Sequence, residues 1–112
     1  MDVDQYQIET ERTAKREWPA VDGATLELLN YALGCAGEGG EIADEVKKVV
    51  FHGHALDKAR MVKELGDYFW YGARLAAWLG VPVSYVLQEN VRKLRQRYPA
   101  GFSEQDSRNR TP

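Results

Sequence analysis

Two pairs of acidic side chains, Glu38 with Glu41 and Glu64 with Asp67, have a spacing suited to holding a metal ion. Side chains three residues apart are neighbours on one face of a helix. Spacing alone is weak evidence, because a chain with this many acids contains roughly 2.5 such pairs by chance. The position of the two pairs on the helical wheel is stronger evidence than their spacing. At about 100° per residue, both pairs lie beside an apolar stripe, whereas a solvated charge run would lie opposite it.

The helices that carry the two pairs are predicted to fold back on each other at Gly53. Positions 38 and 67 share the midpoint 52.5 with positions 41 and 64, so an antiparallel hairpin places Glu38 opposite Asp67 and Glu41 opposite Glu64. Four carboxylates at one height repel unless they are protonated or hold cations. Oxygen-only ligands favour Mg²⁺ or Mn²⁺ over zinc. The alternative interpretation is a set of surface salt bridges, with basic partners among Lys48, Lys63 and Arg74.

A polar ridge of opposite character lies on the helix that follows. Asn90, Lys93 and Arg97 fall together on the helical wheel, beside an apolar stripe. If this helix packs against the carboxylate hairpin, the ridge offers one amide and two cations near the metal. A polyphosphate needs this combination, with metal for some oxygens and Lys or Arg for the rest. Salt bridges to neighbouring acids are the alternative.

Four helical segments must position these groups, over residues 4–18, 24–51, 58–80 and 84–98. Each ends at a glycine or proline signal, and no stretch predicts a strand. Residues 99–112 are expected to form a polar tail. The chain is therefore predicted to be a single all-α domain over residues 1–112, a small helix bundle built on a central antiparallel helix hairpin. Close backbone approach, to another helix or to a ligand, is expected at four glycines, Gly34, Gly37, Gly39 and Gly40.

Composition restricts the class of protein further. The 112 residues carry a formal net charge of -2, which argues against electrostatic binding to nucleic acid or to anionic membranes. The longest uncharged run contains Pro82 and is too short to span a bilayer. Cys35 is the only cysteine, and the first residues are too charged for a signal peptide. The expectation is a reduced, cytoplasmic, soluble protein.

Three sequence segments, GEGGEIADEVKK, KELGDYFWYGARLA and NVRKLRQRYPAGFS, occur in an order and at intervals that resemble the MazG-like nucleoside triphosphate pyrophosphohydrolases. These belong to the all-α NTP pyrophosphatase superfamily, and the resemblance covers roughly residues 26–103. It implies Mg²⁺ as the cofactor, with Mn²⁺ as a possible substitute. The implied metal ligands are Glu38, Glu41, Glu64 and Asp67. The implied substrate-binding residues are Asn90, Lys93, Arg97 and Tyr98.

The resemblance also implies a reaction, the hydrolysis of a nucleoside triphosphate between its α- and β-phosphates to the monophosphate and pyrophosphate. Glu38 or Glu41 would accept the proton of the attacking water, and Lys93 is the third residue with an implied catalytic role. Many relatives carry two glutamates where this chain has Gly37 followed by Glu38, so one potential ligand is absent. Glu45, one turn beyond Glu41, is an alternative ligand.

Two other functions fit the same residues. One is the related phosphoribosyl-ATP pyrophosphatase activity, and the other is a non-catalytic helical dimerisation or regulatory module that has kept the acidic, metal-binding site. In each case, a hairpin with two flanking helices leaves apolar and aromatic surface exposed. A homodimer or a larger homo-oligomer is therefore expected. No residue pattern specifies the base or the sugar.

Overall fold

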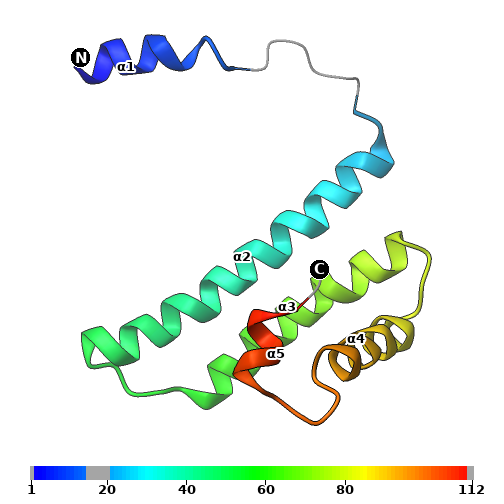
Figure 1. The fold of residues 1–112 in the computed structure, drawn as a ribbon. Helices are drawn as coiled ribbons and strands as arrows, with labels where there is room; N and C mark the ends of the chain where they lie inside the picture. Colours follow the sequence, from blue (N-terminus) through cyan, green and yellow to red (C-terminus); the bar gives the residue numbers. More distant parts are fainter. Residues whose placement is uncertain (1, 15–20, 111–112) are drawn as a thin grey trace.

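The residues that the structure describes form five helices (Figure 1). A computed structural model describes residues 2–14 and 21–110. The helices are α1 (Val3–Thr10), α2 (Gly23–His52), α3 (Lys58–Trp78), α4 (Val83–Arg97) and α5 (Glu104–Arg108). The described residues form no β-strand, only an isolated bridge between Pro99 and Gly101. The all-α class predicted from the sequence is confirmed.

Local chemistry sets the ends of the two long helices. The Asp22 carboxylate accepts a hydrogen bond of 2.7 Å from the backbone N–H of Thr25 and so caps the start of α2. Gly53 ends α2 in the left-handed conformation, with φ of 69°, which a residue with a side chain rarely adopts. Asp57 caps α3 in the same way as Asp22 caps α2. These boundaries lie within one or two residues of those predicted.

The helices α2 and α3 lie antiparallel and side by side, and three polar contacts fix their register (Figure 1). At the open end, the Trp78 indole N–H donates to the backbone carbonyl of Ala24 at 2.9 Å. Arg74 Nε lies 3.4 Å from the Tyr31 hydroxyl, to which it donates. Near the turn, Arg60 forms an ion pair with Glu45 at 3.1 Å. The pairs 31/74 and 45/60 share the midpoint 52.5, which is the predicted register.

A small core lies around Tyr31 on α2. Tyr31 and Ala76 are the buried apolar residues of the described chain. The Tyr31 hydroxyl donates to a Glu27 carboxylate oxygen at 2.8 Å, and the Arg74 guanidinium lies over the Tyr31 ring, 5.5 Å from its centroid. The Trp70 ring meets the same ring edge-on, at 6.2 Å between centroids. This cluster holds the hairpin together on one side of the acidic residues.

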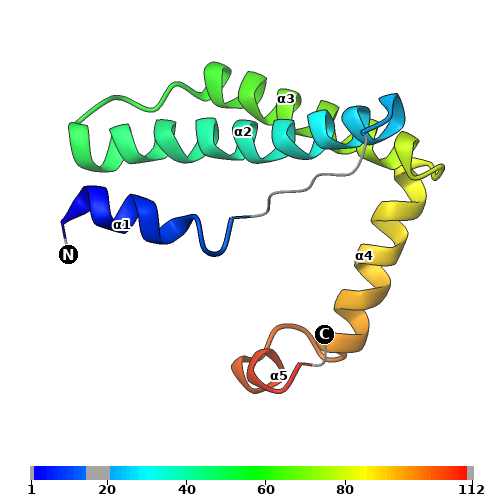
Figure 2. The ribbon, with the colours of Figure 1, turned by 90° about the horizontal axis from the view of Figure 1, so that it is seen from above.

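The remaining helices lie outside the hairpin. Figure 2 shows α4 leaving the open end of the hairpin and carrying α5 away from α2 and α3. The predicted helix over residues 4–18 is too long, because α1 ends at Thr10 and residues 11–13 form a turn. Residues 15–18 of that prediction lie outside the described residues. The predicted polar tail contains a helix, α5. No helix within the described ranges is long and apolar enough to cross a membrane.

Close backbone approach occurs at one of the four glycines for which it was predicted. An added Cβ on Gly34 would overlap the Tyr71 ring of α3. Gly39 has only ordinary contact, 3.9 Å from the Tyr68 ring, and Gly37 and Gly40 face open space. Of the two expected kinds of approach, the approach to another helix is therefore found at Gly34 and not at Gly37 or Gly40.

Gly34→Ala is therefore expected to destabilise the protein, while Gly37→Ala stabilises it. The methyl group at position 34 forces the Tyr71 ring or the helices to shift, at a cost of about 1–3 kcal/mol in the free energy of unfolding. The same change at position 37 meets nothing and gains up to about 1 kcal/mol of helix propensity. Denaturant unfolding of both variants measures the difference, and equal effects would contradict the contact with Tyr71.

Candidate metal centre

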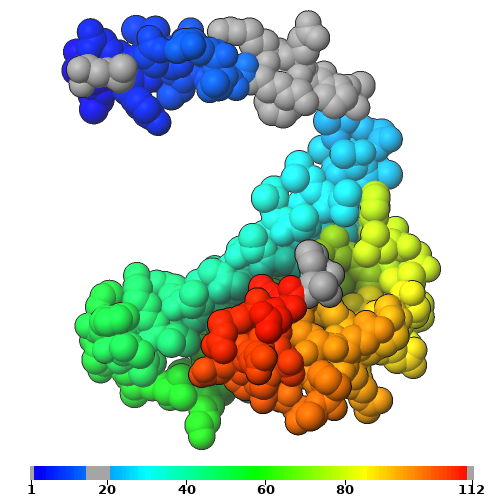
Figure 3. All heavy atoms as spheres, viewed as in Figure 1, coloured from blue at the N-terminus to red at the C-terminus, as the bar shows by residue number. Residues whose placement is uncertain are grey.

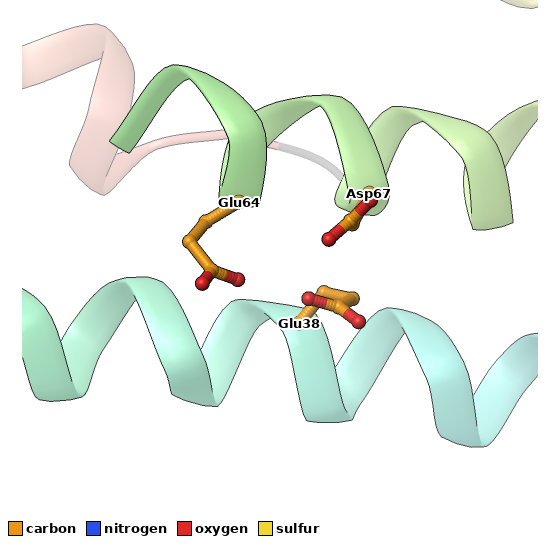
Figure 4. A group of neighbouring side chains, drawn as sticks. All are labelled: Glu38, Glu64 and Asp67. Carbon is orange, nitrogen blue, oxygen red and sulfur yellow. The ribbon is translucent and has the colours of Figure 1, made fainter. Parts of the chain in front are cut away.

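Three carboxylates converge between the two helices of the hairpin. Glu38 points from α2 toward α3, and Glu64 and Asp67 point back toward it from α3 (Figure 4). One oxygen from each of the three side chains lies within 4.8 Å of the other two. Glu38 and Glu64 are half-buried, while Asp67 is exposed to solvent. The opposition of Glu38 and Asp67 follows from the predicted register.

The electrostatics of this group disfavour three simultaneous negative charges. Desolvation raises the pKa of Glu38 above its ordinary value, and the neighbouring charges of Asp67, Glu64 and Glu41 raise it further. A side-chain hydrogen bond with Glu64 acts in the same direction. A proton or a cation between the carboxylates would relieve this repulsion. The oxygen donors are those that hard divalent cations prefer.

Glu41, the fourth predicted ligand, is not a member of the close group. It is exposed and lines a hollow of about 420 Å³ on α2, together with Glu45 and Arg60. Its charge still reaches Glu38, whose pKa it helps to raise. Glu45, considered above as an alternative ligand, is held by Arg60, and its side chain is only 18% exposed. The structure therefore gathers three of the four predicted carboxylates and directs Glu45 elsewhere.

Surface salt bridges do not account for these acids. Within residues 2–14 and 21–110, none of the four predicted ligands has a basic partner within 4.0 Å. Two of the three candidate partners are engaged elsewhere: Lys48 pairs with Asp44 at 3.0 Å, and Arg74 contacts Tyr31. The salt-bridge alternative is thus not what the described side chains form.

Two aromatic residues stand beside the carboxylates, a role that sequence reasoning did not assign to them. Trp70 and Tyr71, with Glu38 and Asp67, line a hollow of about 360 Å³. The sequence favours core or dimer contacts for such aromatic residues, and with 55% of Trp70 exposed, the core of the single chain does not bury it. The usable signal was their position three and four residues after Asp67, which places them on the same side of α3.

The polar ridge of α4 is not brought to the carboxylates within one chain. Lys93 and Arg97 line a separate hollow at the C-terminal end of α4, and Asn90 is exposed on the same helix. Figure 2 shows this end of α4 well apart from the hairpin. Tyr98 follows α4 and packs against Phe102, at 5.5 Å between ring centroids. The predicted packing of the ridge on the acidic site is absent from the described chain.

The raised pKa of Glu38 predicts how the stability of the metal-free protein depends on pH. A carboxyl group whose pKa is higher in the folded chain makes the free energy of unfolding fall as pH rises from its ordinary value, 4.5, through the raised value. Glu38→Gln removes this titration. With a chelator present, the variant is expected to match the parent near about pH 4 and to melt at a higher temperature near about pH 7.

Thermal unfolding followed by circular dichroism at the two pH values measures this difference. Glu9→Gln on α1 is the control, because Glu9 lies outside the carboxylate group and pairs with Arg12. A parent protein that gains stability over Glu38→Gln as pH rises would contradict the sign of the shift.

Comparison with known proteins places these features in a family. Residues 26–102 match the family model described as the MazG nucleotide pyrophosphohydrolase domain. The chain is 39% identical over 116 aligned positions to the Gene 37 protein of Mycobacterium phage L5, and the alignment covers 98% of this chain and 100% of that protein. The name of this relative states no activity. No solved structure matches the chain.

Proposed function

The chain belongs to the MazG nucleotide pyrophosphohydrolase family, and on this premise we propose that it hydrolyses nucleoside triphosphates between the α- and β-phosphates. The products are a nucleoside monophosphate and pyrophosphate. The observation that carries the proposal is the convergence of Glu38, Glu64 and Asp67 between α2 and α3, without a basic partner. The family match covers all three residues.

The carboxylate group fits the divalent ion that the family implies. Three hard oxygen donors lie close enough to share one ion, and their mutual repulsion favours its binding. In the proposal, Glu38, Glu64 and Asp67 hold Mg²⁺, with Mn²⁺ as a substitute. When bound, the ion supplies charge neutralisation to the triphosphate and lowers the pKa of water near it.

The other residues of the proposed site act on the substrate directly. Glu41 lies one turn from Glu38, outside the close group, and in the proposal it accepts the proton of the attacking water. Lys93, the proposed catalytic cation, stabilises charge on the phosphate oxygens, with Arg97 and Asn90 as further donors. Tyr98 is proposed to close the substrate side of the site.

We propose a homodimer as the active form, because one chain does not bring the α4 cations to the carboxylates. The radius of gyration of the single chain is 20.1 Å, whereas a compact chain of this length has a radius of about 13 Å. Between α3 and α4 runs an apolar groove of about 390 Å³. Its walls include Phe69 and Leu87, which are 63% and 59% exposed. In the dimer, a second copy covers this groove, and α4 of one chain approaches the hairpin of the other.

Product analysis with the full-length chain tests the reaction. The protein is incubated with a panel of ribo- and deoxyribonucleoside triphosphates and Mg²⁺, and the nucleotides and phosphates are resolved by ion-exchange chromatography. Glu64→Gln serves as the inactive control. Monophosphate and pyrophosphate, absent with Glu64→Gln, are the expected products, and the relative rates rank the bases.

Other outcomes point to other functions. Diphosphate and phosphate as products would place cleavage at another bond and contradict the proposal. No turnover of the panel, followed by turnover of phosphoribosyl-ATP, would assign the related pyrophosphatase activity. Mg²⁺ binding with no turnover of either substrate would identify a non-catalytic metal-binding module.

A further inference from the structure

A second, basic hollow lies where the chain turns back after α4. The last turns of α4 and the segment around α5 enclose about 330 Å³, within the range of small-molecule sites. Figure 2 and Figure 3 show α5 beside the C-terminal end of α4. Three cationic side chains line the hollow, Lys93 and Arg97 from α4 and Arg110 from beyond α5, and Asp106 is its only acidic residue. Three positive charges against one negative charge leave the hollow with a net charge of +2.

The cations of this hollow are not used in ion pairs. Lys93, Arg97 and Arg110 have no acidic partner within 4.0 Å among the residues that the structure describes. Two other arginines of the same elements do pair: Arg92 with Glu89 at 2.7 Å, and Arg108 with Glu104 at 3.8 Å. Unpaired like charges around one cavity repel, and an anion bound among them would offset that repulsion.

Local structure places Arg110 at the hollow. Gly101, with φ of 91°, lets the chain reverse after α4. The Ser103 hydroxyl accepts a hydrogen bond of 3.0 Å from the backbone N–H of Asp106 and so starts α5. The backbone N–H of Asn109 donates to the Gln105 carbonyl at 3.0 Å and closes α5. These bonds direct the end of α5 back toward α4.

The hollow has donors suited to phosphate oxygens. Arg97 and Arg110 each present a guanidinium group, which can bind two oxygens at once, and Lys93 offers an ammonium group. Gln96 and Asn109 add neutral amide groups at its wall. Asp106, Asn109 and Arg110 lie beyond residue 102, where the family match ends, so the family match does not cover this part of the hollow.

We propose that Arg110 completes a polyphosphate-binding site with Lys93 and Arg97, and that the segment after α5 is thereby part of the substrate-binding machinery. The identity of the bound anion as the substrate's phosphate chain rests on the proposed function, whereas anion binding in the hollow does not. Asp106 limits the affinity by placing one negative charge among the three cations.

The first test is binding of inorganic pyrophosphate to the full chain by isothermal titration calorimetry, with a chelator present to exclude divalent metal. Arg110→Ala is expected to weaken binding about tenfold, the usual scale for losing a hydrogen bond between charged groups. Arg108→Ala is the matched control, because Arg108 belongs to α5 but pairs with Glu104 and does not line the hollow. It should leave the affinity unchanged, and Asp106→Asn should tighten binding.

Equal affinities of Arg110→Ala and Arg108→Ala for pyrophosphate would overturn the proposal, as would unchanged or weaker binding by Asp106→Asn.

A second readout, the Michaelis constant for the best nucleoside triphosphate, separates this proposal from the proposed function. Arg110→Ala should raise it about tenfold with little change in turnover. Triphosphate hydrolysis with the parental Michaelis constant in Arg110→Ala would overturn the role of Arg110 and leave the function standing. Pyrophosphate binding that depends on Arg110, without hydrolysis of any nucleotide, would support the anion site and contradict the function.

Discussion

Glu38→Gln is expected to lower triphosphate hydrolysis by about a hundredfold or more without unfolding the protein. Glu38 is the one acid of α2 in the close carboxylate group, so its loss leaves only the two ligands from α3. The fold should survive, because the substitution removes the charge that its neighbours repel. Initial rates at saturating Mg²⁺, with circular dichroism as the check on folding, measure the effect.

Glu41→Gln separates ion binding from proton transfer. Mg²⁺ that binds only the folded chain raises its melting temperature by mass action. This rise should vanish in Glu38→Gln and persist in Glu41→Gln, since Glu41 lies outside the close group, while both variants lose turnover. Loss of the Mg²⁺ effect in Glu41→Gln would make Glu41 a ligand. Full activity in a folded Glu38→Gln variant would contradict the proposed metal centre.

Phe69→Asp is expected to dissociate the dimer and abolish hydrolysis while leaving Mg²⁺ binding intact. Phe69 lines the apolar groove between α3 and α4, and a carboxylate there must be desolvated when a second chain covers the groove. Together with the lost apolar contact, this should raise the dimer dissociation constant about a hundredfold or more. Light scattering coupled to size exclusion should show the mass fall from twice 12.7 kDa to 12.7 kDa.

Leu56→Asp is the control for Phe69→Asp. Leu56 is also exposed, but it lies in the turn between α2 and α3 and does not line the groove. It should keep both the dimer and the activity. A parent protein that is a fully active monomer would contradict the proposed assembly, and so would a Phe69→Asp variant that stays dimeric.

The parts of the structure that local rules govern could be predicted from the sequence. Aspartate caps and glycine ends set the bounds of α2 and α3. A short turn at Gly53 then leaves one antiparallel register in which both acidic pairs lie beside the apolar faces. That register alone predicts that Glu38 lies opposite Asp67, as the structure shows.

The parts that depend on distant contacts could not be predicted. A helical wheel gives the face on which Lys93 and Arg97 lie, but not the direction that α4 takes after the turn at Gly80 and Pro82. The glycine pattern, similarly, does not show that Tyr71 lies over Gly34 alone. The composition of residues 99–112 is polar enough for a tail, and the Ser103 cap that starts α5 is a single short signal.

The Tyr31–Arg74 hydrogen bond and the Glu45–Arg60 ion pair flank the carboxylate group, and these two contacts have a consequence for the order of folding. The Glu45–Arg60 pair lies 15 residues apart and closes only a small loop, and the Tyr31–Arg74 contact, 43 residues apart, then forms as the two helices align from the turn outward. Contacts of this kind form early and rapidly. The nascent hairpin can therefore assemble its three acids before a second chain arrives. Under the proposed function, a newly made molecule is then competent to capture its ion while still a monomer, and association with a second chain completes the catalyst.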